Sequence, residues 1–120
     1  LGTAEIYSEV EKFAEIQESI VVGQSWDNDI RIILFVVLNS NSELTEELIN
    51  KIKKQIKINA SPRHVPSKII AVTDIPRTKN GKIVELAVKN VIEGNDIKNK
   101  EALANPEVLD QYKGLRELNN

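Results

Sequence analysis

Two lysines enclose an Asn-Gly pair in the segment Ile75-Pro-Arg-Thr-Lys-Asn-Gly-Lys82. Asn-Gly between two short extended runs is a strong signal for a two-residue type I′ hairpin turn. In such a turn Lys79 and Lys82 lie directly opposite each other, which destabilises the strand pair because the two charges repel. A sequence that breaks a local rule marks a candidate functional site, although water at an exposed turn would also screen this repulsion.

A lysine at the tip of a hairpin can carry a positive charge to a distant phosphate without a general base beside it. Phosphoryl and nucleotidyl transfer depend mostly on positioning and on charge stabilisation. The composition agrees with this chemistry, because the chain has no cysteine and only one histidine, His64. Thiol nucleophiles and cysteine zinc sites are therefore excluded, and histidine relays are disfavoured. His64 lies between two prolines, and we assign it no catalytic role.

The hairpin belongs to a strongly basic segment of a weakly acidic chain. Residues 51–82 contain nine lysines and arginines and one acid, Asp74, whereas the rest of the chain has a net charge of -10. This pattern predicts an anionic partner, either the phosphates of a nucleotide or coenzyme or a nucleic acid. A solvated lysine-rich face is the alternative. Aromatic residues make up only 4% of the chain, which argues against a stacking platform for single-stranded nucleic acid.

The elements that must position this hairpin form an α+β pattern. Apolar residues at helical spacing predict helices over residues 4–14, 44–57 and 85–92 and from Pro106 onward. Apolar runs predict strands over residues 20–22, 30–38 and 69–72. The run 30–38 is almost unbroken, which is typical of a central strand covered on both faces. The expected fold is a three-stranded sheet packed with helices, with a protruding two-stranded hairpin over residues 74–84.

Local signals complete this outline. Ser42 or Thr45 can cap the helix over residues 44–57, and Glu47 and Lys51 form a favourable pair on it. Residues 24–29 are polar and predict a turn, in which Trp26 is a partly exposed packing residue.

The length of 120 residues predicts one domain over residues 1–120. No apolar run reaches the roughly 18 residues that span a bilayer. Because the chain begins with Leu1 and contains no methionine, we interpret it as a piece of a longer protein. No secretory signal is visible, which favours a cytoplasmic location.

The segment Ile75-Pro-Arg-Thr-Lys-Asn-Gly-Lys82 resembles the Pro-(Arg/Lys)-Thr-x-x-Gly-Lys motif of adenylate-forming enzymes, which include acyl-CoA synthetases, peptide synthetase adenylation domains and firefly luciferases. The opening Leu1-Gly-Thr-Ala-Glu-Ile-Tyr-Ser-Glu-Val-Glu11 is similar to the first C-terminal-domain motif of that superfamily, in its acetyl-CoA synthetase form. Three further segments resemble the acetoacetyl-CoA-forming branch: Ser61-Pro-Arg-His-Val-Pro66, Gly81-Lys-Ile-Val-Glu-Leu-Ala-Val-Lys89 and Ala102-Leu-Ala-Asn-Pro-Glu-Val-Leu-Asp110. The resemblance therefore covers essentially the whole chain.

The resemblance implies a mobile C-terminal lid domain of an acid–thiol ligase. Its expected partner is an N-terminal domain of the same polypeptide, which binds most of the ATP, Mg²⁺ and carboxylic acid. In such enzymes the carboxylate attacks the α-phosphate of ATP, giving an acyl-adenylate and pyrophosphate. The lid then rotates, and the CoA thiol attacks the adenylate and releases AMP. By resemblance, Lys82 is the catalytic lysine that pairs with the carboxylate and α-phosphate oxygens in the first step.

For the second step, the resemblance implies that Lys57 contacts a CoA phosphate and that backbone beside Gly2 lines the pantetheine tunnel. Lys57 replaces an arginine, so a bidentate contact is lost, and a role in the helix dipole alone is the alternative. Glu85 stands where many members have arginine, which fits the acetoacetyl-CoA branch. We therefore expect acetoacetate as the acid, with acetate or another short acid as the alternative.

Two general expectations remain. The isolated domain should be inactive, because the nucleotide pocket lies outside it. The alternative from another class is a stand-alone module that binds nucleic acid through its basic segment. The lid interpretation expects neither nucleic acid nor a membrane as a partner.

Overall fold

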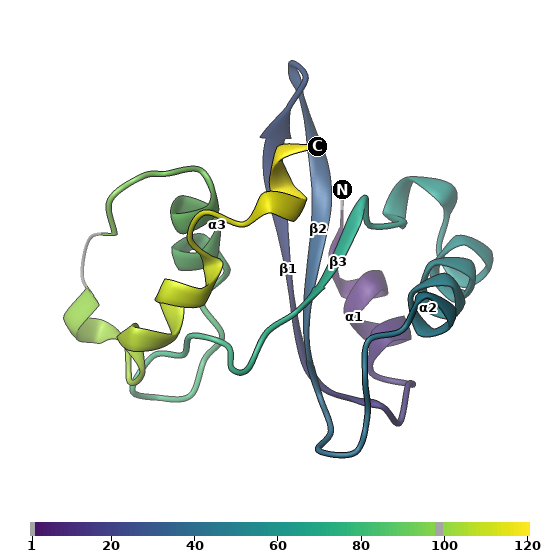
Figure 1. Cartoon of the computed structure of the whole chain (residues 1–120), viewed down its shortest axis with the longest axis horizontal. Helices are drawn as coiled ribbons and strands as arrows, with labels where there is room; N and C mark the ends of the chain where they lie inside the picture. Colours follow the sequence, from purple (N-terminus) through teal and green to yellow (C-terminus); the bar gives the residue numbers. More distant parts are fainter. Residues whose placement is uncertain (1, 98–99) are drawn as a thin grey trace.

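The computed structural model describes residues 2–97 and 100–120 as a three-stranded sheet with helices on both faces (Figure 1). The α-helices are α1 (Ala4–Val10), α2 (Glu46–Asn59) and α3 (Glu85–Ile92), and the strands are β1 (Ile16–Trp26), β2 (Asp29–Leu38) and β3 (Lys68–Ala71). Four short 3₁₀ helices are described: η1 (Pro62–His64), η2 (Lys100–Ala102), η3 (Pro106–Tyr112) and η4 (Arg116–Asn119). The predicted α+β fold is therefore confirmed.

Strand β2 lies at the centre of the sheet, antiparallel to β1 and parallel to β3. Ile33 and Phe35 point from β2 toward α3 and the C-terminal residues, whereas Leu34 and Val36 point toward α1 and α2. All four side chains are fully buried. The prediction of a central strand covered on both faces is confirmed, since an unbroken apolar run is stable only where both faces are dry.

The turn between β1 and β2 is shorter than predicted. Residues 24–29 do not form a turn, because β1 continues to Trp26 and β2 begins at Asp29. Only Asp27 and Asn28 connect the strands, and their φ angles of 51° and 61° are those of a type I′ turn. The polar Gln24 can occupy a buried strand position because its amide donates to the Leu118 carbonyl and accepts from the Arg31 side chain.

Trp26 packs at the end of β1, as a partly exposed residue, against the Arg31 guanidinium, which lies 3.9 Å from the ring centroid. This is a cation–π arrangement. The prediction that Trp26 is a partly exposed packing residue is confirmed, although its position is in a strand and not in a turn.

Helix α2 forms where the sequence predicts a helix, but it begins at Glu46 and ends at Asn59, two residues later than the predicted range 44–57. Thr45 is the cap, because its hydroxyl accepts a hydrogen bond of 3.1 Å from the Leu48 backbone N–H. The predicted pair forms, with 3.5 Å between Lys51 Nζ and Glu47 Oε1. The buried side chains Leu48, Ile52 and Ile56 repeat at helical spacing and attach α2 to the sheet.

Two predicted helices differ from the structure. The helix expected over residues 4–14 ends at Val10, because Lys12 and Phe13 donate to carbonyls three residues earlier and turn the chain into β1. The helix expected from Pro106 is the 3₁₀ helix η3, which buries Leu109 and Tyr112 against the sheet. The sequence predicted an apolar helix face after Pro106, but it did not indicate that the helix would be a 3₁₀ helix and not an α-helix.

Glu9 joins α1 to α2 through a buried carboxylate. Its Oε1 accepts hydrogen bonds from Asn59 at 2.8 Å and from Gln55 at 3.2 Å, and its Oε2 lies 3.0 Å from Lys12 Nζ. The Asn59 bond, followed by Lys12 and Gln55, holds the pKa of Glu9 below its usual value of 4.5. A carboxylate with a lowered pKa in the folded state stabilises the fold above its unfolded pKa.

We expect Glu9→Gln to lower the unfolding temperature at pH 7, because the variant loses the charge that these donors bind. The difference from the wild-type chain should shrink as the pH falls below about 4.5, since the wild-type carboxylate is then protonated as well. Thermal unfolding between pH 3 and pH 8 measures both effects, with the exposed Glu11→Gln as the control. A deficit that stays constant across this pH range would contradict the role assigned to the charge.

Candidate functional site

The hairpin over residues 74–84 has a three-residue loop. The Thr78 N–H donates to the Lys82 carbonyl at 2.8 Å, and the Thr78 carbonyl accepts from the Gly81 N–H at 2.9 Å. Lys79, Asn80 and Gly81 form the loop, and Gly81 has a φ of +85°. This is the three-residue hairpin that ends in a glycine bulge. The prediction of a two-residue type I′ turn is wrong, because Asn80 does not adopt the positive φ that such a turn requires.

Because the loop has three residues and not two, the residue opposite Lys82 differs from the predicted one. Thr78, not Lys79, is paired with Lys82, and the Thr78 hydroxyl accepts from the Lys82 N–H at 3.2 Å. The predicted repulsion between two facing lysines is therefore absent. The two arms meet at a single bridge between Arg77 and Ile83, so they do not form two regular strands.

Lys82 is exposed beside the loop tip, as are Lys79 and Asn80. Within residues 2–97 and 100–120, neither lysine has a carboxylate within ion-pairing distance. Both ammonium groups are therefore available to an anionic partner. Lys82 differs from Lys79 in following the glycine bulge, where its own backbone N–H and C=O are bonded to Thr78.

Arg77, the third cation of this region, is paired within the domain. Its guanidinium contacts Glu18 of β1 and lies 3.3 Å from Asp74 Oδ1. The Glu18 bond is the main reason that the pKa of Arg77 is raised. The Ile75 N–H, followed by Asn105 and Arg77, lowers the pKa of Asp74. Arg77 thus fixes the base of the hairpin and is not free for a ligand.

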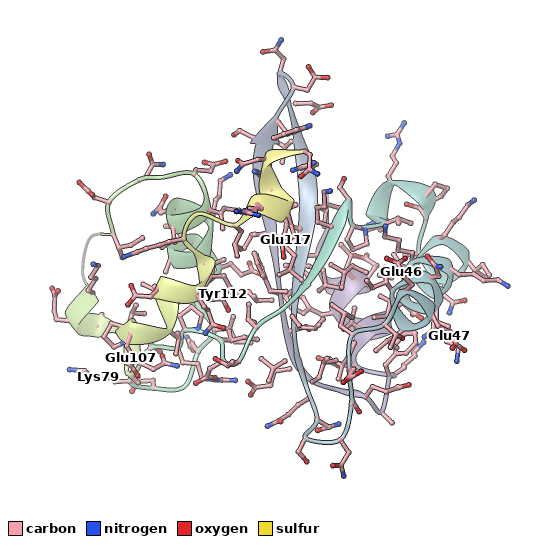
Figure 2. All side chains as sticks on the ribbon, viewed as in Figure 1. Glu46, Glu47, Lys79, Glu107, Tyr112 and Glu117 are labelled. Carbon is pink, nitrogen blue, oxygen red and sulfur yellow. The ribbon has the colours of Figure 1, made fainter. Side chains whose placement is uncertain are left out.

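The basic segment over residues 51–82 does not form one surface. Helix α2, with Lys51, Lys54 and Lys57, packs on the sheet face that carries Leu34, whereas the hairpin lies with α3 on the opposite side (Figure 1). Figure 2 accordingly places Lys79 far from Glu46 and Glu47 at the start of α2. The basic residues of this segment are therefore divided between two places in the fold and do not form one binding site.

Lys57 and Gly2 belong to the α1 and α2 side of the sheet. Lys57 lies in the last turn of α2 with an exposed side chain. Gly2 lies two residues before the start of α1 and is exposed. A Cβ there would lie 2.9 Å from Glu5 Oε2, at the end of a flexible side chain. Glu5 in turn lies 3.9 Å from His64 Nε2, in the loop that follows α2. The structure thus separates these two predicted residues from Lys82 by the sheet.

Glu85, at the first position of α3, is held by Tyr7 of α1. The Tyr7 hydroxyl donates to the Glu85 carboxylate and accepts from the Val21 N–H at 2.8 Å. Burial, followed by the Glu85 bond, raises the pKa of Tyr7, so the hydroxyl keeps the proton that it donates. The side chain that replaces arginine at this position therefore connects α1, β1 and α3.

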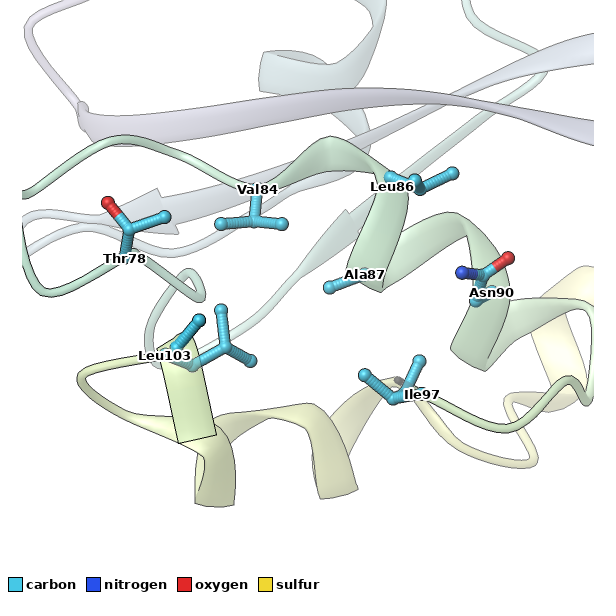
Figure 3. A pocket seen from close by; sticks show the side chains of 8 residues that line it. Thr78, Val84, Leu86, Ala87, Asn90, Ile97 and Leu103 are labelled. Atoms are coloured by element: carbon cyan, nitrogen blue, oxygen red, sulfur yellow. The ribbon is translucent and has the colours of Figure 1, made fainter. Parts of the chain in front are cut away.

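A small pocket of about 200 Å³ lies beside the base of the hairpin (Figure 3). Its walls are mostly apolar, with Val84, Ala87 and Leu103, and its polar side chains are Thr78 and Asn90. This volume is below that of ordinary sites for cofactor-sized molecules. The described residues also contain no group of three or more His, Asp or Glu side chains that could hold a metal ion.

Three residues that organise the hairpin were not identified from the sequence, although Asn105 lies in a segment that carried the family resemblance. Glu18 binds Arg77, Asn105 binds the backbone on both sides of Pro76, and Tyr112 donates to the Asp74 carbonyl at 2.8 Å. Asn105 and Tyr112 are far from the hairpin along the chain, so only the folded structure brings them to it.

The described residues match a known family of domains. Residues 5–82 match the family described as AMP-binding enzyme C-terminal domain. The matched range ends at Lys82, the candidate lysine. The chain belongs to this family. The resemblance inferred from the hairpin motif is therefore confirmed.

None of the described helices is long and apolar enough to cross a membrane.

Relatives of this AMP-binding enzyme C-terminal domain match it over nearly its whole length. It is 60% identical over 118 residues to acetoacetyl-coenzyme A synthetase of Rhizobium meliloti (strain 1021), which covers 98% of this chain and 18% of that protein. It is 43% identical over 120 residues to acetoacetyl-CoA synthetase of Gallus gallus, which covers 99% of this chain and 18% of that protein. The domain thus spans less than a fifth of the length of these relatives.

Solved structures give the same result. Acetoacetyl-CoA synthetase from Streptomyces lividans superposes with a TM-score of 0.87 at 36% identity, covering 100% of this chain and 18% of that chain. A benzoate CoA ligase from Burkholderia xenovorans LB400 has a TM-score of 0.68 at 26% identity and covers 74% of this chain and 18% of that chain. The domain is therefore similar to the C-terminal part of larger ligases.

Proposed function

We propose that residues 1–120 form the C-terminal lid domain of an acetoacetate–CoA ligase. The observation that carries this proposal is the similarity to acetoacetyl-CoA synthetases over 98% of the chain at 60% identity. The reaction forms acetoacetyl-CoA, AMP and pyrophosphate from acetoacetate, ATP and CoA through an acyl-adenylate. The proposal includes a cytoplasmic enzyme whose N-terminal domain, on the same polypeptide, binds acetoacetate, ATP and Mg²⁺.

In the first step an acetoacetate oxygen forms a bond to the α-phosphorus of ATP, and the bond between that phosphorus and the pyrophosphate oxygen breaks. No proton is transferred, so the enzyme needs no general base. Negative charge is concentrated where the two anions approach, and a fixed ammonium group there lowers the barrier. The exposed Lys82, which follows a bonded glycine bulge and has no ion pair in the described part of the chain, supports this role.

In the second step the CoA thiol loses its proton to water and its sulfur forms a bond to the acyl carbon of the adenylate. The bond between that carbon and the phosphate oxygen breaks, and AMP leaves. We assign a CoA phosphate contact to Lys57 and a place along the pantetheine arm to the backbone beside Gly2. Both residues lie on the α1 and α2 side of the sheet, whereas the hairpin lies on the other side. A rotation of the domain between the two steps would therefore present each group in turn.

The choice of acid is tested with the full-length protein that contains this domain. We expect the kcat/KM of ATP–pyrophosphate exchange to be at least about tenfold higher with acetoacetate than with acetate, because a pocket selects strongly when it binds a polar group such as the keto oxygen. Butyrate, of equal chain length without this oxygen, is the matched control substrate. A higher kcat/KM with acetate than with acetoacetate would favour the alternative, a lid domain of another short-chain acyl-CoA synthetase.

A further inference from the structure

The first arm of the hairpin is bonded along its outer edge to the C-terminal segment, defined here as residues 100–120. Arg77 and Lys79 are the residues that make its backbone contacts. The Ala104 N–H donates to the Arg77 carbonyl at 2.8 Å, and the Lys79 N–H donates to the Ala102 carbonyl at 3.3 Å. A bridge between Thr78 and Leu103 lies between these two bonds. Residues 102–104 of the C-terminal segment, between η2 and η3, thus lie beside the first arm of the hairpin.

Asn105 bonds to the same arm with its side chain. Its Oδ1 accepts from the Arg77 N–H at 2.9 Å, and its Nδ2 donates to the Ile75 carbonyl at 3.0 Å and to Asp74 Oδ2 at 3.3 Å. One amide therefore satisfies backbone groups on both sides of Pro76. Proline has no N–H, so this part of the arm has few donors of its own with which to pair.

Tyr112 holds the start of the arm. Its hydroxyl donates to the Asp74 carbonyl at 2.8 Å, and its ring is fully buried against Phe35 of β2. Burial raises the pKa of Tyr112, so the hydroxyl keeps its proton. The Tyr112 side chain thereby connects Phe35, at the centre of the sheet, to the base of the hairpin.

The second arm, which carries Lys82, is bonded mainly to the first. The Lys82 N–H and carbonyl bond to Thr78, and the Val84 N–H donates to the Pro76 carbonyl. An isolated two-stranded hairpin is marginally stable in water. The bonds that Ala102, Ala104 and Asn105 make to the first arm therefore supply support that the second arm does not give. The position of Lys82 therefore depends on the first arm, and the position of the first arm depends on the C-terminal segment.

We infer that the C-terminal segment positions Lys82 for adenylation, with Asn105 and Tyr112 as positioning residues that act through the first arm of the hairpin. This inference rests on the proposed role of Lys82. Both residues lie beyond residue 82, where the match to the family ends, and within the segment that acetoacetyl-CoA synthetases share with this chain. The supporting residues thus lie outside the range matched by the family model, whereas Lys82 is the last residue inside it.

The test compares four forms of the full-length protein: wild type, Asn105→Ala, Lys82→Ala and the double variant. We expect Asn105→Ala to lower kcat for adenylation about 10- to 100-fold, which is the scale of a misplaced catalytic group. Thioester formation from preformed acetoacetyl-adenylate and CoA should change less than about twofold, because Lys82 has no part in that step. In the Lys82→Ala background, Asn105→Ala should have no further effect, because it acts through Lys82.

Gln111→Ala is the matched control. Gln111 lies next to Tyr112 in η3, but its side chain accepts from the Thr73 N–H at 2.7 Å, outside the hairpin. This variant should leave adenylation within about twofold of wild type. Tyr112→Phe, which keeps the ring and removes only the bond to Asp74, should reproduce the selective loss in a milder form.

Each result has one interpretation. If Asn105→Ala lowers both half-reactions equally, or lowers adenylation equally with and without Lys82, the positioning role is wrong and the residue only stabilises the fold. If Lys82→Ala abolishes adenylation while Asn105→Ala and Tyr112→Phe leave it unchanged, the inference fails and the proposed function stands. If Lys82→Ala itself leaves adenylation intact, the proposed role of Lys82 fails together with the inference.

Discussion

Replacing Lys82 by alanine in the full-length protein is expected to lower ATP-dependent adenylation of acetoacetate by about 10²- to 10³-fold, which is the usual loss when a group that stabilises a developing charge is removed. The Lys82 side chain is exposed and its ammonium has no ion pair within residues 2–97 and 100–120, so removing it breaks no salt bridge that holds the fold. The unfolding temperature should therefore stay close to that of wild type. ATP–pyrophosphate exchange with acetoacetate measures the loss.

The same variant should keep the second half-reaction. Formation of acetoacetyl-CoA from preformed adenylate and CoA is expected to proceed at nearly the wild-type rate, because the proposed CoA contacts lie on the other side of the sheet. A loss confined to one half-reaction distinguishes a catalytic lysine from a lysine that supports the whole enzyme. Survival of both half-reactions would show that the hairpin lysine is not the adenylation lysine.

Lys79→Ala is the matched control for this experiment. Lys79 has the same charge and is equally exposed, but it lies inside the loop and not after the glycine bulge. If any positive charge near the active site were sufficient, the loss of either lysine would reduce the rate of adenylation. A loss specific to Lys82 would instead depend on geometry, because the two lysines differ only in where the turn directs them.

The turn illustrates what the sequence can and cannot predict. Asn80-Gly81 correctly marked the point at which the chain reverses, because glycine readily adopts the positive φ found there. Asn80 favours the same region, but the structure leaves it outside that region and places three residues in the loop. Local propensity therefore located the turn. The pairing of Thr78 with Lys82 occurs together with contacts between the first arm and residues 100–105, which lie outside a local window.

Periodicity was most reliable where one face or both faces of an element are buried. The run around Phe35 predicted the central strand, and the spacing of Leu48, Ile52 and Ile56 predicted α2, because burial there leaves little choice of side chain. The polar run 24–29 suggested a turn that would contain Trp26, although Gln24 and Trp26 are both accommodated in β1 through contacts with Arg31. Such compensation between separate strands is invisible in a local window.

The C-terminal segment was the least predictable part. Residues 102–110 carried part of the family resemblance and Pro106 predicted a helix, but neither signal indicated which groups Asn105 and Tyr112 would bind. The hydrogen bonds that define its role join residues 28 to 38 positions apart. Long-range polar contacts of this kind depend on the completed fold. The sequence motif therefore predicts a role for Lys82 but does not indicate the residues that hold the hairpin.

Phe35→Ala is expected to cause the largest loss of stability in the domain. The Phe35 side chain is fully buried in β2, and its ring meets the Tyr112 ring edge-to-face with 4.8 Å between centroids. Truncation removes this contact and leaves a cavity between the sheet and the C-terminal segment, which typically costs about 3–5 kcal/mol. Because a domain of this size has a free energy of unfolding of roughly 5–15 kcal/mol, the variant should approach the limit of folding.

Urea unfolding of the chain measures this loss, and Leu86→Ala is the matched control. Leu86 is 65% exposed, so its truncation should change the free energy of unfolding by no more than about 0.5 kcal/mol. A change below about 1 kcal/mol for Phe35→Ala would mean that the C-terminal segment does not depend on the sheet for its position. The expected large change instead makes the sheet centre, Tyr112 and the Asp74 carbonyl successive links of one path to the hairpin. Any substitution that loosens the Phe35 contact should then also reduce adenylation, at temperatures where the domain is still folded.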